Sequence, residues 1–106
     1  MQAAARARLN GEVGAMWEAT EGAVVIELLG HQRMRSSLVY PDHQVHYDFI
    51  SDLHELYDLR KDPWQEHDLF DRRPDLARRF ERLMRRYRDL RARAARYSLG
   101  RRPATP

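Results

Sequence analysis

The sequence predicts an α+β domain in which an antiparallel sheet of about four strands packs against one long C-terminal helix. Short apolar or alternating runs before residue 60 predict the strands, and a change to helical periodicity at Pro74 predicts the helix. The length of 106 residues corresponds to about one domain with a single small core. Because the sheet needs a cover, the helix is expected to pack on it.

The strands are expected within residues 12–59. The first is an apolar, β-branched run between Gly22 and Gly30, which is typical of a buried strand. In the next two, apolar and polar side chains alternate, as in half-buried antiparallel strands. The expected strands lie at residues 23–29, 33–40, 44–49 and 55–59, with a further candidate at 13–17.

The helix is expected over residues 74–98. Pro74 suits the first helical position, Asp75 complements the positive end of the helix dipole, and Gly100 is a stop signal. Apolar side chains recur at alternating spacings of four and three and so form one stripe. The stripe consists of Leu76, Phe80, Leu83, Tyr87, Leu90, Ala94 and Tyr97. It would also fit a coiled-coil seam, but packing on the preceding sheet is the favoured interpretation.

The ends of the chain are polar. Residues 1–11 are Ala/Arg-rich and are expected to be a flexible tail or linker, and residues 101–106 a disordered tail. The domain itself is expected to occupy residues 12–100, with a connector at 60–73 between sheet and helix.

The composition excludes several classes of protein. The absence of cysteine excludes disulfides, thiolate zinc sites and thiol nucleophiles. No apolar run approaches the ~18–20 residues that cross a bilayer, and the first eight residues do not form a secretory signal. The sequence therefore predicts a soluble chain without a membrane partner, cytoplasmic by default.

The net charge of +3 is unevenly distributed, because residues 72–102 are strongly basic and the rest of the chain is acidic. Only Asp75, Glu81 and Asp89 offset the basic side chains there. The asymmetry indicates either an anionic partner or, the favoured interpretation, a solvated helix face. The 13 arginines of this region are Arg72, Arg73, Arg78, Arg79, Arg82, Arg85, Arg86, Arg88, Arg91, Arg93, Arg96, Arg101 and Arg102.

The histidines do not predict a metal site. His43 and His46 are three residues apart on an expected strand, and an odd spacing sends them to opposite faces of the sheet. Zinc requires a third ligand, and the other histidines are isolated in the sequence. All five are expected to be surface histidines: His31, His43, His46, His54 and His67.

Catalytic residues are not predicted either. The carboxylates that could serve acid–base chemistry are expected to stay ionised because Arg60 and Lys61 lie beside them. The sequence contains no phosphate-binding glycine loop and no nucleophile elbow. Neither a catalytic nor a cofactor-binding nor a metal-binding residue is therefore assigned. The carboxylates considered are Asp58, Asp62, Glu66 and Asp68.

Residues 54–69 are the most informative stretch of the chain. Leu56, Tyr57 and Leu59 are expected to anchor a short strand, and Asp62-Pro63 to start a turn. Leu69 or Phe70 would then return to the core before the helix begins. On these grounds alone the stretch could be a connector without chemical significance.

The same stretch resembles the C-terminal end of the sulfatase family, in the alkaline-phosphatase-like superfamily. The family pattern E-L-Y-D-L-x-x-D-P-x-E-x-x-N-L is matched at residues 55–59, at Asp62-Pro63 and at Leu69. The chain departs from it at Gln65, where Glu is usual, and at Asp68, where Asn is usual. With the preceding strands and the terminal helix, the resemblance covers residues 23–97.

The resemblance implies a non-catalytic role. Sulfatases use a formylglycine made from Cys or Ser in a C/S-x-P-x-R motif, together with a divalent metal, usually calcium. This chain contains neither that motif nor the metal ligands, so no family catalytic residue carries over to it. The chain is expected to be the C-terminal subdomain or a fragment of a sulfuric ester hydrolase. Its expected partner is a catalytic domain, supplied in cis or in trans, whose substrate cleft it would help to wall.

A binding module is the alternative interpretation. In that case the arginine-rich helix would bind nucleic acid or an acidic protein, with Arg78, Arg82, Arg85 and Arg88 neutralising phosphates. Under the sulfatase interpretation, nucleic-acid binding is expected to be only weak and salt-sensitive.

Overall fold

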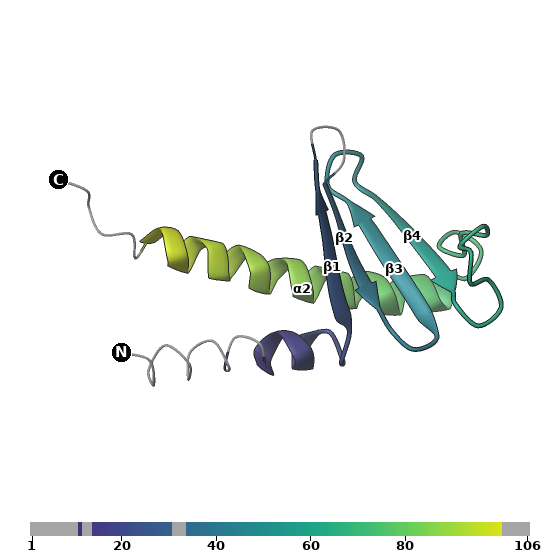
Figure 1. Cartoon of the computed structure of the whole chain (residues 1–106), viewed down its shortest axis with the longest axis horizontal. Coiled ribbons are helices and arrows are strands. Elements are labelled where there is room, and N and C mark those ends of the chain that lie inside the picture. Colours follow the sequence, from purple (N-terminus) through teal and green to yellow (C-terminus); the bar gives the residue numbers. More distant parts are fainter. Residues whose placement is uncertain (1–10, 12–13, 31–33, 101–106) are drawn as a thin grey trace.

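The computed structural model of the chain describes residue 11, residues 14–30 and residues 34–100, with side chains up to residue 94. A four-stranded antiparallel sheet is followed by one long helix, so the predicted α+β class is confirmed. Figure 1 shows the helix crossing one face of the sheet. The elements are β1 (Val24–Leu29), β2 (Met34–Val39), β3 (His43–Asp48), β4 (Leu53–Asp58) and α2 (Pro74–Gly100).

The strands follow one another across the sheet in the order β1-β2-β3-β4, each antiparallel to the next. The register aligns Val25 with Leu38, Leu38 with Val45, and Val45 with Leu56. Since side chains alternate between faces, this row points to one side of the sheet, which we call the inner face. The opposite side is the outer face.

Helix α2 packs on the inner face through the predicted stripe. Phe80, Leu83 and Tyr87 are buried there, whereas Leu76 and Leu90 are half-buried. Ala77 and Met84 are buried as well, so the apolar face is wider than the predicted stripe. The stripe therefore contacts the chain's own sheet over its first half, in agreement with the favoured interpretation. The core cluster consists of Ala23, Leu38, Val45, Tyr47, Leu56, Phe80, Leu83, Met84 and Tyr87.

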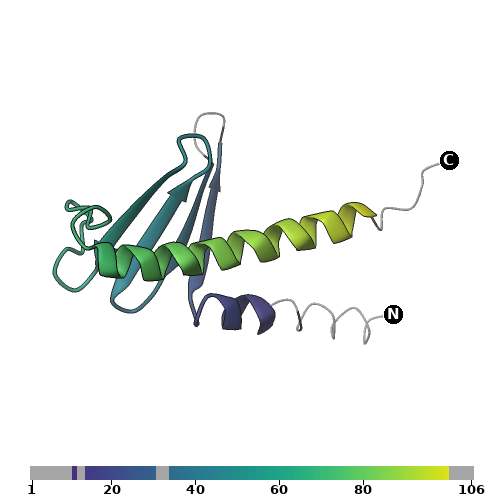
Figure 2. The ribbon, with the colours of Figure 1, turned by 180° about the vertical axis from the view of Figure 1, so that it is seen from behind.

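The second half of α2 extends past β1, as Figures 1 and 2 show from opposite sides. A short helical segment at residues 14–19 lies beside this half. The two helices border a hollow of about 460 Å³ that is lined by Ala15, Ala19 and Leu90 among others.

The helical segment corrects one prediction. Strands were expected from residue 12, with a candidate at 13–17, but residues 14–19 are helical. Thr20 closes the helix by donating its hydroxyl to the Met16 carbonyl at 2.8 Å. Gly22 follows at φ 82°, a conformation that glycine adopts without strain, and its N–H bonds to the Trp17 carbonyl.

The other predicted boundaries agree closely with the structure. The helix, expected over 74–98, runs to Gly100, and the four strands begin and end within a few residues of the expected positions. The predicted tails fall on residues 1–10 and 101–106, which lie outside the described residues, except that Gly11 is helical.

Candidate functional site

The outer face carries the strongest candidate for a functional surface. Its side chains come from alternate positions of all four strands and divide into two regions. On β1 they are apolar, and we call Val24, Ile26 and Leu28 the apolar strip. On β2, β3 and β4 they are mostly polar. The register places Ile26 beside Ser37, Ser37 beside His46, and His46 beside Glu55.

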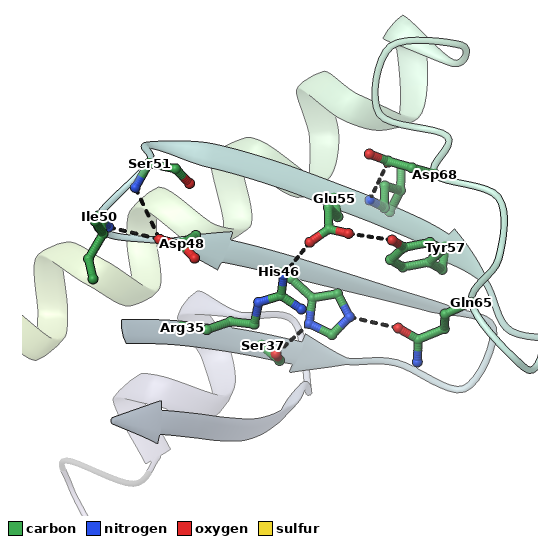
Figure 3. Close-up of polar contacts among 11 residues, drawn as sticks. Arg35, Ser37, His46, Asp48, Ile50, Ser51, Glu55, Tyr57, Gln65 and Asp68 are labelled. Atoms are coloured by element: carbon green, nitrogen blue, oxygen red, sulfur yellow. Dashed lines mark hydrogen bonds and ion pairs between the residues drawn. The ribbon is translucent and has the colours of Figure 1, made fainter. Parts of the chain in front are cut away.

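A hydrogen-bonded chain joins the polar region to the connector (Figure 3). Ser37 Oγ lies 2.5 Å from His46 Nδ1, and His46 Nε2 lies 2.7 Å from Gln65 Oε1. Gln65 donates its amide to Gln44 Oε1 at 2.9 Å, so its own Oε1 faces the imidazole and accepts. His46 therefore carries its proton on Nε2, and Ser37 donates to Nδ1.

Burial keeps this imidazole neutral. Removal from water lowers the pKa of His46, although the Gln65 hydrogen bond opposes the shift. A serine donating to a neutral histidine is the arrangement of a nucleophile and its base. Here, however, Ser37 is 5% exposed and His46 is 7% exposed. A substrate cannot reach the hydroxyl, so the chain of hydrogen bonds serves to tie the connector to the sheet.

A second polar group lies beside the first. Arg35 forms an ion pair with Glu55, which also accepts the Tyr57 hydroxyl at 2.5 Å. Burial, and then the hydrogen bond to the Glu55 carboxylate, raise the pKa of Tyr57. Arg35 Nε is buried and has no hydrogen-bond partner among the described residues. Tyr57 itself is buried on the outer face with its hydroxyl turned to Glu55, so it anchors the strand as predicted but lies outside the core cluster under α2.

The apolar strip, in contrast, is open to solvent. Val24, Ile26 and Leu28 are 60%, 53% and 55% exposed. A contiguous row of three large aliphatic side chains on a rigid strand is a typical protein-interaction surface. Among the described residues, Trp64 is exposed as well, at 83%, on the connector that holds Gln65 against the same face.

Three aspartates order the connector. Asp58 accepts from the backbone N–H groups of Arg60 and Lys61, and Asp62 from those of Glu66 and His67. These hydrogen bonds lower the pKa of both carboxyls. The expectation that they stay ionised is met, but the main cause is backbone N–H donation and not the charge of neighbouring side chains.

Asp68 fastens the end of the connector to the sheet. Its Oδ1 accepts from the backbone of Leu56 and of Phe70, both at 2.9 Å. The next residue, Leu69, donates its N–H to the Leu56 carbonyl at 2.7 Å. The connector thus covers the edge of β4. Of the four carboxylates considered from the sequence, only Glu66 has no such role in the structure.

The histidines occupy different environments. His43 and His46 lie on opposite faces, as predicted, and the His43 ring is 5.2 Å from that of Phe80. His54 stacks on Phe70 with centroids 5.0 Å apart. The prediction of surface histidines is wrong for His46, which is buried, and fits His67, which is exposed. His31 lies outside the described residues. No three His, Asp or Glu residues gather into a metal-binding group within the described ranges.

The arginine side chains of α2 do not form one common solvated face. Arg88 lies over the Tyr47 ring, with its guanidinium carbon 3.9 Å from the centroid. Arg91 forms an ion pair with Glu27 of β1, with Nε 2.5 Å from Oε1, and donates a hydrogen bond to Oε2 at 2.9 Å. Tyr87 also donates to Glu27. The sequence pattern did not predict this cluster, whose one signal was a glutamate within an otherwise apolar strand.

Comparisons with protein-family models, with curated proteins and with solved structures find no match for this chain. Within the part of the chain that the structure describes, no helix is both long and apolar enough to cross a membrane.

Proposed function

We propose that the chain is a non-catalytic subdomain of a sulfatase-like hydrolase that packs on a catalytic domain through its outer face. The observation that carries the proposal is the apolar strip, which leaves the face opposite α2 partly apolar and exposed. In this role the subdomain would help to wall the substrate cleft of a sulfuric ester hydrolase.

The structure of the connector supports the resemblance on which the proposal depends. The residues that match the family pattern are structural: Asp58 and Asp62 cap turns, and Leu69 bonds to β4. The two residues that depart from the family pattern form the hydrogen bonds that the usual residues would form. Gln65 accepts from His46, as Glu would, and Asp68 accepts from the Leu56 backbone, as Asn would.

The polar region would give the docking surface its rigidity. Its buried residues Ser37, His46 and Tyr57 are already hydrogen-bonded within the chain, so docking does not have to order them. The apolar strip and Trp64 would then supply the surface removed from water. Fully burying aliphatic side chains of this size is worth roughly 1.5–3 kcal/mol each.

Coexpression tests the proposal. The DNA upstream of this coding sequence is read for an open frame that encodes C/S-x-P-x-R, and its product is coexpressed with the chain. We expect the two to copurify and the complex to hydrolyse an aryl sulfate. Ile26→Lys should abolish copurification, while Leu29→Lys, on the same strand but directed to the inner face and 60% exposed, should retain it.

The chain alone is expected to leave aryl sulfates and aryl phosphates unhydrolysed, with or without Ca²⁺ or Mg²⁺. Ser37 is inaccessible, and the chain has no cysteine from which a formylglycine could be made. Metal-dependent turnover by the isolated chain that His43→Ala abolishes would contradict the proposal.

The arginine-rich helix remains the second candidate, because Arg78, Arg82 and Arg85 are exposed on α2. Arg88, the fourth member of the predicted set, is engaged with Tyr47, which weakens this candidate. Duplex and single-strand DNA binding at physiological salt should be no tighter than the ~10⁻⁴–10⁻⁶ M of non-specific complexes. A sequence-selective nanomolar complex, lost when the three exposed arginines become glutamine, would favour the binding module.

A further inference from the structure

Three arginines of α2 and one phenylalanine border a hollow on the inner side of the sheet. Its volume of about 440 Å³ lies within the range of small-molecule sites. The arginines recur at every third residue and therefore lie along one side of the helix. We call this space the arginine hollow, and its lining consists of Phe49, Arg85, Arg88, Asp89, Arg91 and Ala92.

The guanidinium group of Arg88 is held in place by two aromatic rings. Its carbon lies 3.9 Å from the ring centroid of Tyr47 and 5.7 Å from that of Phe49. The two rings pack edge to face with centroids 5.1 Å apart, and Tyr47 is buried. Stacking of this kind uses the flat face of a guanidinium and leaves the N–H donors at its edge available.

Arg88 is half-buried, yet no carboxylate neutralises it. Within the part of the chain that the structure describes, its guanidinium forms neither an ion pair nor a hydrogen bond. Asp52 accepts the Tyr47 hydroxyl at 2.6 Å but is not paired with Arg88. A partly desolvated charge without a partner is unfavourable, and an anion that enters the hollow would relieve it.

The other charged side chains of the hollow differ in what they can offer an anion. Arg91 is already paired with Glu27. Arg85 reaches Glu81 only at 3.5 Å and is 69% exposed, so this weak pair leaves it free to turn toward a ligand. Asp89 adds one negative charge to the lining. A ligand with a single negative charge is therefore favoured over one with two.

Apolar side chains continue from Phe49 along the end of the sheet. The Phe49 N–H donates to the Met34 carbonyl at 2.8 Å, and Met34 pairs in turn with Leu29. Both Met34 and Leu29 are exposed. The arginine hollow thus has a cationic wall on α2 and an apolar wall on the sheet, which is the combination that an amphipathic anion requires.

We propose that the arginine hollow binds an aromatic organic anion that carries a single negative charge. The edge of Arg88 would donate to the oxyanion, Arg85 would close over it, and the aromatic ring would pack against Phe49. Carboxylates, sulfonates and sulfate monoesters share the paired oxygens that fit a guanidinium edge. Stacking withdraws Arg88 from a flat surface such as duplex DNA, but a small anion can still reach it.

This site is independent of the proposed contact with a catalytic domain. Tyr47 is part of the core cluster under α2, and Phe49 lies two residues further along the chain and packs against that cluster. The hollow therefore belongs to the inner face, whereas the proposed docking surface is the outer face. Failure of one proposal would leave the other intact.

An NMR titration of the full chain with 1-naphthalenesulfonate tests the site. We expect saturable shifts at Phe49 and at the Arg88 side chain, with a dissociation constant on the order of 1 mM for a ligand of this size. Arg88→Gln should weaken binding about tenfold, and Arg88→Lys, which keeps the charge but not the fork, should recover only part of it. Asp89→Asn should tighten it about twofold.

The matched control is Arg82→Gln, which removes an exposed arginine of α2 outside the lining and should leave binding unchanged. The spectrum of each unliganded variant verifies that it is folded. Equal losses in Arg82→Gln and Arg88→Gln would overturn the proposal, because they would indicate attraction to the helix as a whole. So would the absence of saturable shifts, or shifts centred on the apolar strip of the outer face.

Further probes separate the parts of the ligand. Inorganic sulfate lacks the ring and 1-naphthol lacks the charge, so each should bind at least about tenfold more weakly than the sulfonate. Comparison with 1-naphthoate shows which oxyanion is preferred, and either preference supports the site. Tighter binding of the doubly charged 1-naphthyl phosphate would overturn the assignment of a single charge, and equal binding of 1-naphthol would overturn the role of Arg88.

Discussion

The two faces of the sheet are built from the same four strands and differ in what holds them in place. On the inner face, Leu38, Val45 and Leu56 are fully buried under α2. On the outer face, Val24, Ile26 and Leu28 are more than half exposed, although they are equally apolar. Burial here depends on whether a second layer is present and not on residue type.

The outer face keeps its order by hydrogen bonds in place of a packed layer. Its buried members are Ser37, His46 and Tyr57. Ser37 and His46 bond to each other across two strands, His46 also bonds to the connector, and Tyr57 bonds to Glu55 on its own strand. Apolar packing therefore stabilises one face, and a polar network with one connector stabilises the other. Substitutions on the two faces should differ in size and in their response to pH.

The largest effect is expected from the inner face. Phe80 is 3% exposed and its ring contacts those of Tyr40 and His43. Phe80→Ala should lower the free energy of unfolding by about 3–5 kcal/mol in urea melts. The control on the outer face is Ile26→Ala, which should change it by no more than about 0.5 kcal/mol. Equal losses would mean that the apolar strip is covered in solution.

Tyr57 tests the polar network of the outer face. Tyr57→Ala removes a buried ring and should cost about 3–5 kcal/mol of unfolding free energy. Tyr57→Phe keeps the ring and loses only the hydrogen bond to Glu55, so about 1 kcal/mol is expected. A neutral Tyr57→Ala variant in urea melts would contradict the buried position of this side chain on the outer face.

Asp62 tests the connector with a smaller and local effect. Asp62→Ala removes the acceptor for the N–H groups of Glu66 and His67, so their amide exchange should accelerate. Glu66→Ala is the control, because the Glu66 side chain is exposed and accepts none of these bonds. Faster exchange confined to residues 63–68 is expected by NMR, with the sheet amides unchanged.

The smallest expected effect is a pH dependence. Burial lowers the pKa of His46, and also that of His54, so the folded chain binds protons less readily than the unfolded chain. Their contribution to stability is complete above the unfolded pKa of ~6.5 and falls as the pH drops below it. Urea melts at descending pH should show this loss. His46→Gln should reduce the loss without removing it, since His54 remains; an unchanged profile would show that His46 is not buried.

Much of the fold was predictable because its signals are local. The alternation of apolar and polar residues predicted β2 and β3. The stripe from Leu76 to Tyr87 predicted which side of α2 packs on the sheet. The helix at residues 14–19 was not predicted, because Met16 and Trp17 alone suggest neither period. Thr20 and Gly22 terminate this helix through hydrogen bonds, which cannot be read from the sequence pattern.

The candidate surface was less predictable because it depends on contacts between distant residues. Gln65 and His46 are 19 residues apart, and Arg91 and Glu27 are 64 apart. No spacing rule connects such pairs. The sequence could predict that His46 faces away from His43, but not that the connector would cover it. Similarly, exposure of Val24, Ile26 and Leu28 contradicts the expectation of a buried first strand.

Both tryptophans of the chain lie on its surface, Trp17 at 60% exposure and Trp64 at 83%. Indole emission shifts to longer wavelength in water, so the fluorescence of the native chain should already resemble that of an unfolded one. Intrinsic fluorescence would then report unfolding poorly. For the same reason, a blue shift on adding another protein would report that Trp64 or Trp17 has left water, and single Trp→Phe variants would tell which side of the molecule was covered.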